Sequence, residues 1–210
     1  MENINFAGLL SDSIKESIES YSGKELAFHA LQGKIELLLR DKIAWNLETK
    51  LSKYGYYVKK EYNPNPDRVK CDLAILDQDK KQKCLVEFKA AIWGEYQKKE
   101  YTDCCEVDCN KMRGFANGEE IPMYYVFFQI YHRVKEDSNL DPQLIAYIPA
   151  IKTEINKIKG GLVPRNVTEW GDTYVNHSNN IKVYYQDIGE YYGVEVGIAT
   201  MILEVSSMSR

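Results

Sequence analysis

Three charged residues, Asp72, Glu87 and Lys89, lie in two short apolar segments that otherwise suit burial. A charge inside a buried strand costs free energy unless it is paired or binds a metal. Two neighbouring carboxylates repel each other, a divalent cation such as Mg²⁺ relieves that repulsion, and an adjacent lysine can stabilise a phosphate. The carbonyl of Phe88, between Glu87 and Lys89, is a further candidate ligand. These residue types suit metal-assisted hydrolysis of a phosphodiester bond.

The two apolar segments flank a polar turn, and this pattern predicts a β-hairpin. The three parts are Lys70–Leu76, the turn Asp77–Gln82 and Cys84–Lys89. A register centred on the middle of the turn places Asp72 opposite Glu87, and Lys89 then projects from the same face because strand side chains alternate. We expect the other face to be buried and to carry Cys71, Leu73, Ile75, Cys84, Val86 and Phe88.

A long helical segment precedes the hairpin and would have to pack on it. From Lys24 to about Tyr54 the apolar residues follow helical spacing. Ser22 and Glu25 have the spacing of a capping box that opens this segment. Gly33 is placed to split or bend the helix, and Gly55 is placed to end it.

The remaining segments predict one mixed α/β domain. Residues 1–22 form a helical arm, residues 23–150 the core, and residues 151–210 a C-terminal β-rich extension. Outside the parts described above, we expect strands at 56–62, 123–131, 144–148, 181–185 and 194–205, and a helix that begins at an Asp103–Glu106 capping box and ends near Asn117.

The hairpin resembles the active-site hairpin of the PD-(D/E)xK nuclease superfamily, which has a restriction-endonuclease-like fold. In that family an Asp on one strand and an E-x-K on the next carry catalysis. The resemblance therefore implies that Asp72 and Glu87 bind the metal and that Lys89 assists the attack on the phosphate. It also implies an αβββαβ core, a mixed central sheet flanked by helices, over roughly residues 24–150.

Many members of this family carry an acidic residue on the helix before the hairpin. Glu36 is the candidate here because it lies at the edge of the apolar stripe, and Glu48 is the alternative. The helix with Asp108–Met112 also resembles the helix that follows the motif in this family.

The chain departs from the family pattern at the first acidic residue. Cys71 precedes Asp72, whereas a literal Pro-Asp pair occurs at Pro66 and Asp67. Asp67 lies in a Pro- and Asn-rich segment typical of a turn, so we favour Asp72 as the metal ligand.

The resemblance implies an Mg²⁺-dependent endodeoxyribonuclease of the restriction or phage-defence type, in which Mn²⁺ substitutes for Mg²⁺. Double-stranded DNA would be the partner, and a homodimer would allow both strands to be cut. Residues 151–210 would then supply substrate or dimer contacts. Two alternatives stay open: a catalytically silent binding module with the same fold, and a nuclease that acts on RNA or single strands.

The charge and the cysteine content limit the classes of protein to which this chain could belong. The formal net charge of −4 argues against a binder that relies on a basic surface, but not against a nuclease with an acidic site. Five cysteines without a CxxC pair indicate reduced thiols in a cytoplasmic protein, and the spacing of Cys104, Cys105 and Cys109 does not suit zinc. We expect neither a signal peptide nor a membrane-spanning helix, because no apolar run is long enough.

Overall fold

The computed structural model describes residues 4–64, 69–92, 99–134 and 178–207. The helices are α1 (Phe6–Glu19), α2 (Gly23–Gln32), α3 (Glu36–Leu51) and α4 (Lys99–Ala116), with a 3₁₀ turn, η1, at Ser52–Tyr54. The strands are β1 (Tyr57–Tyr62), β2 (Cys71–Leu76), β3 (Gln82–Ile92), β4 (Met123–Val134), β5 (Ser178–Tyr191) and β6 (Val194–Val205). The predicted α/β class is confirmed. The predicted strand at 144–148 lies outside the described residues.

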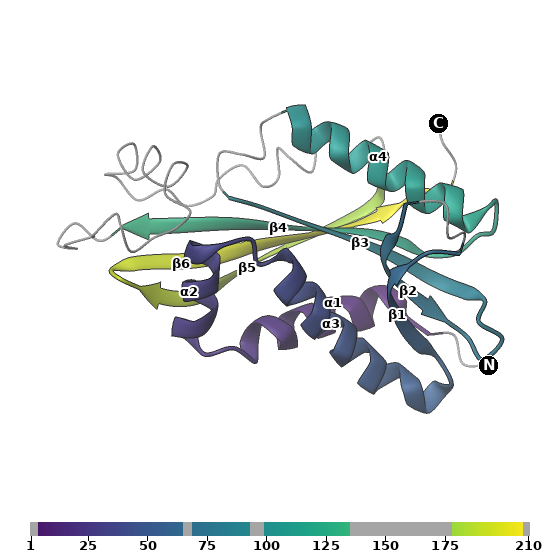
Figure 1. The fold of residues 1–210 in the computed structure, drawn as a ribbon, viewed down its shortest axis with the longest axis horizontal. Helices are drawn as coiled ribbons and strands as arrows, with labels where there is room; N and C mark the ends of the chain where they lie inside the picture. Colours follow the sequence, from purple (N-terminus) through teal and green to yellow (C-terminus); the bar gives the residue numbers. More distant parts are fainter. Residues whose placement is uncertain (1–3, 65–68, 93–98, 135–177, 208–210) are drawn as a thin grey trace.

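The strands form one six-stranded mixed sheet in the order β1-β2-β3-β4-β6-β5. Among the strands of the described residues, only β3 and β4 are parallel neighbours, and α4 lies in the crossover between them, since parallel neighbours cannot be joined by a tight turn. Helices α1 to α3 cover one face of the sheet and α4 covers the other (Figure 1).

The hairpin has the predicted register. Leu73 pairs with Val86 and Ala74 with Leu85, which leaves Asp72 at the level of Glu87. Leu73, Val86 and Phe88 lie in the core beneath α1 to α3. The opposite face is also buried rather than open, because Ala74 and Leu85 pack in a second core with α4.

Cys71 is a correction to the predicted faces. It lies in the core beneath α4, not with Leu73 in the core beneath α1 to α3. Regular alternation would put Cys71 and Leu73 on the same side. The strand is therefore distorted at the residue between them, Asp72.

The helices before the hairpin are split at the glycine that the sequence singled out. The Ser22–Glu25 capping box forms and opens α2, but α2 ends at Gln32 and α3 begins at Glu36. Gly33 is extended there, which agrees with its low helix propensity, so it splits the helical segment as predicted. Gly55 ends η1 in the left-handed region with φ of 77°, as predicted.

Helix α4 starts earlier than the sequence indicated. It begins at Lys99, so Asp103 lies inside the helix and the predicted Asp103–Glu106 capping box does not open it. The end of the helix at Ala116 agrees with the prediction. None of the helices among the described residues is long and apolar enough to span a membrane.

A glycine in β5 fixes the contact between the far end of the sheet and α2. Gly189 has a φ of 113°, and a Cβ at this position would collide with the backbone of Gly23. Gly189→Ala is therefore expected to lower the free energy of unfolding by about 2 kcal/mol or more in a denaturant titration. Gly114→Ala in α4 is the control, because that position has open space, and it should raise stability by about 0.5–1 kcal/mol. Equal effects of the two substitutions would contradict this account.

Candidate functional site

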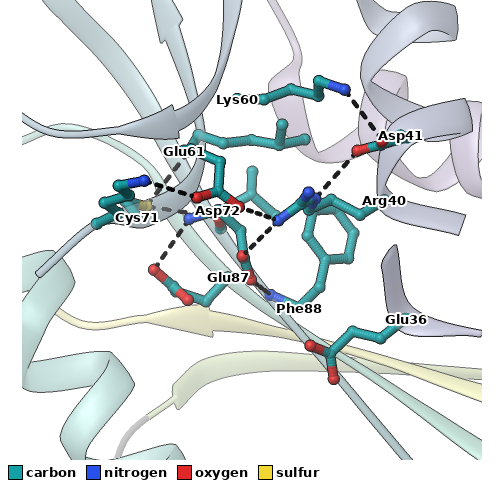
Figure 2. Close-up of polar contacts among 12 residues, drawn as sticks. Glu36, Arg40, Asp41, Lys60, Glu61, Cys71, Asp72, Glu87 and Phe88 are labelled. Carbon is teal, nitrogen blue, oxygen red and sulfur yellow. Dashed lines mark hydrogen bonds and ion pairs between the residues drawn. The ribbon is translucent and has the colours of Figure 1, made fainter. Parts of the chain in front are cut away.

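The site lies where β2 separates from β3. The register between these strands ends at the Leu73–Val86 pair. Beyond it, the Phe88 N–H donates to Oδ2 of Asp72 at 2.9 Å, and the Asp72 N–H donates to Oε1 of Glu87 at 3.2 Å (Figure 2). Carboxylate oxygens thus accept the hydrogen bonds that backbone carbonyls accept in a regular β-ladder. These bonds hold the side chains of Asp72 and Glu87 at the opening between β2 and β3.

Strand β1 is distorted at the same level. The Glu61–Asp72 pair is absent from the β1–β2 register, although the Lys60–Leu73 and Tyr62–Cys71 pairs on either side are present. Glu61 has a φ of 51°, a left-handed conformation that costs a non-glycine residue about 1–3 kcal/mol. Such strain is concentrated at functional sites, and here it coincides with the irregularity at Asp72.

A buried arginine from α3 holds this irregular region together. Arg40 is 7% exposed, and its Nη1 lies 3.3 Å from Oδ1 of Asp72 and 2.7 Å from Oε1 of Glu61. Its Nε lies 3.2 Å from Asp41, which also pairs with Lys60 at 3.0 Å. Figure 2 shows this chain of charges, with Arg40 reaching Asp72 from α3. A planar guanidinium suits such multiple carboxylate contacts.

Glu87 is the most deeply buried acid of the site, at 3% exposure. Its Oε1 lies 2.9 Å from the ammonium of Lys111 on α4, and Lys111 also pairs with Asp108 at 3.0 Å. Burial, and next the nearby charge of Asp72, raise the pKa of Glu87 to about 8 although Lys111 opposes the shift. Burial alone would lower the pKa of Lys111, but Glu87 and Asp108 raise it above its usual range.

Glu36 lies farther along the same open edge of β3. Its Oε2 accepts a hydrogen bond from the Ala90 N–H at 2.8 Å, two residues beyond the Phe88 N–H that Asp72 accepts. Burial raises the pKa of Glu36, the Ala90 hydrogen bond and the charge of Lys89 offset part of this, and the charge of Asp72 adds to it. Glu36 is therefore within electrostatic reach of Asp72 and Lys89.

Glu48, the alternative helix carboxylate, has a different position. Its Oε2 accepts a hydrogen bond from the Val58 N–H at 2.6 Å, near the start of β1. It satisfies the backbone of that strand, so Glu36 is the helix carboxylate that faces the opening between β2 and β3.

Lys89 is half-buried on β3 and, by strand alternation, projects from the same face as Glu87. The lysine that pairs with Glu87 is Lys111, whereas the charge of Lys89 acts on Glu36 and lowers its pKa. The carboxylate of Asp72 lies in the gap between the strands, not on that face, and its cation comes from α3.

Arg40 and Lys111 are the site residues that the sequence argument missed. Arg40 follows Glu36 by four residues, so both lie on one face of α3, and Lys111 follows Asp108 by three residues on α4. These spacings were visible in the sequence. Nothing in the spacing indicated that either cation would meet a carboxylate of the hairpin.

The donor set suits a hard divalent cation. Two carboxylates and a main-chain carbonyl are oxygen ligands of the kind that Mg²⁺ takes. A strand residue directs its N–H and C=O to the same side, so the Phe88 carbonyl faces the same opening as the N–H that Asp72 accepts. Within the described ranges, no group of three or more His, Cys, Asp or Glu side chains is arranged to hold a metal ion. The candidate ligand set is therefore limited to two carboxylates, those of Asp72 and Glu87, with the Phe88 carbonyl.

Comparisons of the chain with protein-family models, with curated proteins and with solved structures found no match in any of the three.

Proposed function

We propose that this protein is an Mg²⁺-dependent endodeoxyribonuclease with a restriction-endonuclease-like core. The observation that supports this most strongly is the meeting of Asp72 and Glu87 at the point where β2 leaves β3. A buried carboxylate with its pKa raised to about 8 next to a second acid is a typical feature of a functional site. A divalent cation would relieve the repulsion between the two groups.

Each residue would have a separate role. Asp72, Glu87 and the Phe88 carbonyl would hold the cation, which when bound would polarise the phosphate and orient a water molecule. Lys89 would stabilise the charge that develops on the phosphate. Glu36, with a raised pKa, is suited to accept a proton from the attacking water.

Double-stranded DNA as substrate, a restriction or phage-defence role and a homodimeric assembly follow from the family resemblance and are proposed with it. A substrate panel of duplex DNA, single-stranded DNA and RNA would decide which nucleic acid is cut. Residues 151–210 would contribute substrate or dimer contacts.

A catalytically silent binding module is the second candidate, and one observation favours it. Arg40 and Lys111 already pair with Asp72 and Glu87 without a metal. Such ion pairs would allow the acidic residues to serve structure alone. Calorimetric titration with Mg²⁺ and Mn²⁺ separates the candidates, because a silent module should give no heat that depends on Asp72.

The proposal is tested most directly at Lys89. Lys89→Ala is expected to lower the rate of Mg²⁺-dependent plasmid cleavage by about 10²-fold, the lower end of what a positioned acid–base or electrostatic group contributes. Metal binding should stay close to wild type, because Lys89 is not a ligand. Single-turnover cleavage and calorimetry measure the two effects.

Lys83→Ala is the matched control, since Lys83 lies on the same strand but pairs with Asp77 in the turn at 3.1 Å. It should cut as wild type does. Full activity of Lys89→Ala would remove Lys89 from the mechanism.

A further inference from the structure

Lys111 reaches the site from the opposite side to Arg40. It lies on α4, and its side chain is only 14% exposed. Its ammonium is 2.9 Å from Oε1 of Glu87 and 3.0 Å from Oδ1 of Asp108. Glu87 is thus held by a cation that itself has a second carboxylate partner one helical turn away.

The two cations of the site differ in how firmly they are fixed. Arg40 contacts three carboxylates, those of Asp41, Glu61 and Asp72, through a rigid planar group. Lys111 has two carboxylate partners and a flexible four-carbon stem, and one partner, Asp108, lies on its own helix. Lys111 can therefore give up Glu87 and remain paired, whereas Arg40 is tied to the distorted β1–β2 region.

A divalent cation and an ammonium group compete for the same carboxylate. Glu87 Oε1 already accepts hydrogen bonds from Lys111 and from the Asp72 N–H. A metal bound to Glu87 would meet the positive charge of Lys111 at close range in a poorly hydrated site, where charge interactions are strong.

We propose that Lys111 is a positioning residue that holds Glu87 in the metal-free protein and shifts to Asp108 when a divalent cation binds. This inference rests on the proposed function, because it assumes that Asp72 and Glu87 form the metal site. Lys111 then sets the affinity of the site by competition and contacts no reacting atom.

Competition and structural support predict opposite effects of Lys111→Met on metal affinity. If Lys111 competes with the metal, then Lys111→Met removes the competitor and tightens metal binding by about tenfold. Asp108→Asn removes the second partner of Lys111, leaves the lysine on Glu87 and weakens metal binding. If Lys111 only supported the fold, both substitutions would weaken binding or leave it unchanged.

The test is calorimetric titration of the full chain with Mg²⁺ and with Mn²⁺, together with thermal unfolding in EDTA. Lys111→Met should bind either metal about tenfold more tightly than wild type, while its midpoint in EDTA falls because Glu87 loses its partner. Lys111→Arg should restore both values toward wild type. Lys83→Met is the control for loss of an ion-paired lysine away from the site and should change neither affinity.

Unchanged or weaker metal binding by Lys111→Met would overturn the role of Lys111. Should that variant fail to fold, Lys111→Gln takes its place, because an uncharged amide can still donate to Glu87 but does not repel a metal ion, and metal binding no tighter than that of wild type would overturn the proposal. A different result would overturn the proposed function. If wild type, Lys111→Met and Asp108→Asn all failed to bind metal, there would be no metal site at Asp72 and Glu87.

Discussion

Replacing Asp72 with Asn is expected to lower Mg²⁺-dependent DNA cleavage by about 10³-fold. A catalytic metal contributes several kcal/mol of transition-state stabilisation, and each 1.36 kcal/mol corresponds to about a tenfold change in rate. The amide oxygen of Asn is a weaker metal ligand than a carboxylate and leaves Glu87 as the only charged ligand. Single-turnover cleavage of a supercoiled plasmid measures the rate, and calorimetry should show a matching loss of Mg²⁺ affinity.

The fold should survive this substitution. The side-chain oxygen of Asn can still accept the Phe88 N–H, and Arg40 retains Glu61 and Asp41 as partners. Asp67→Asn is the control, because Asp67 is the acid of the literal Pro66-Asp67 pair and the alternative first ligand; it lies outside the described residues. A loss of cleavage in Asp67→Asn with full activity in Asp72→Asn would reverse the assignment of the first ligand.

Glu87→Gln is expected to stabilise the metal-free protein at high pH while it abolishes metal binding. In wild type the pKa of Glu87 rises from its ordinary value of 4.5 to about 8, chiefly through burial and then through Asp72. The folded state therefore binds more protons than the unfolded state between these two values, and stability falls as the pH rises through this window. The full loss, reached above pH 8, is about 3–5 kcal/mol.

Denaturant titrations in EDTA at pH 5, 7 and 9 measure this dependence. Glu87→Gln should resemble wild type at pH 5 and exceed it by a few kcal/mol at pH 9, since a neutral amide carries no ionisation cost. Lys111 keeps Asp108 as a partner in this variant. The exposed Glu119→Gln substitution serves as the control and should follow the wild-type profile. If the stability of wild type rose relative to that of Glu87→Gln between pH 5 and pH 9, burial would not be raising the pKa of Glu87.

The register of the hairpin could be predicted because two local signals agree. The polar turn fixes which residues face each other, and the alternation of apolar residues fixes which face is buried. Leu73 pairs with Val86 as expected, so Asp72 stands at the level of Glu87. The position of Cys71 could not be predicted, because Asp72 on β2 contacts Arg40 from α3, and Arg40 also binds Glu61 in the distorted part of β1.

Sequence patterns could not identify the cations of the site, for the same reason. The E-x-K spacing points to Lys89, but the ammonium beside Glu87 is that of Lys111. Which of several lysines meets a buried carboxylate depends on how α4 packs on the sheet. That packing is set by the core beneath α4, which contains Cys105, Cys109 and Met112.

The arrangement of strands also bears on how the chain folds. The residues of the site, from Glu36 to Lys111, belong to one continuous stretch of chain that ends before β4. In contrast, β4 pairs with β6 through contacts such as Val134 with Val194, which close a longer loop than the Leu73–Val86 pair of the hairpin does. Since the entropy of loop closure grows with loop length, the hairpin and its helices can associate before the sheet is completed. The carboxylates would then already be in register while half of the sheet is still unformed.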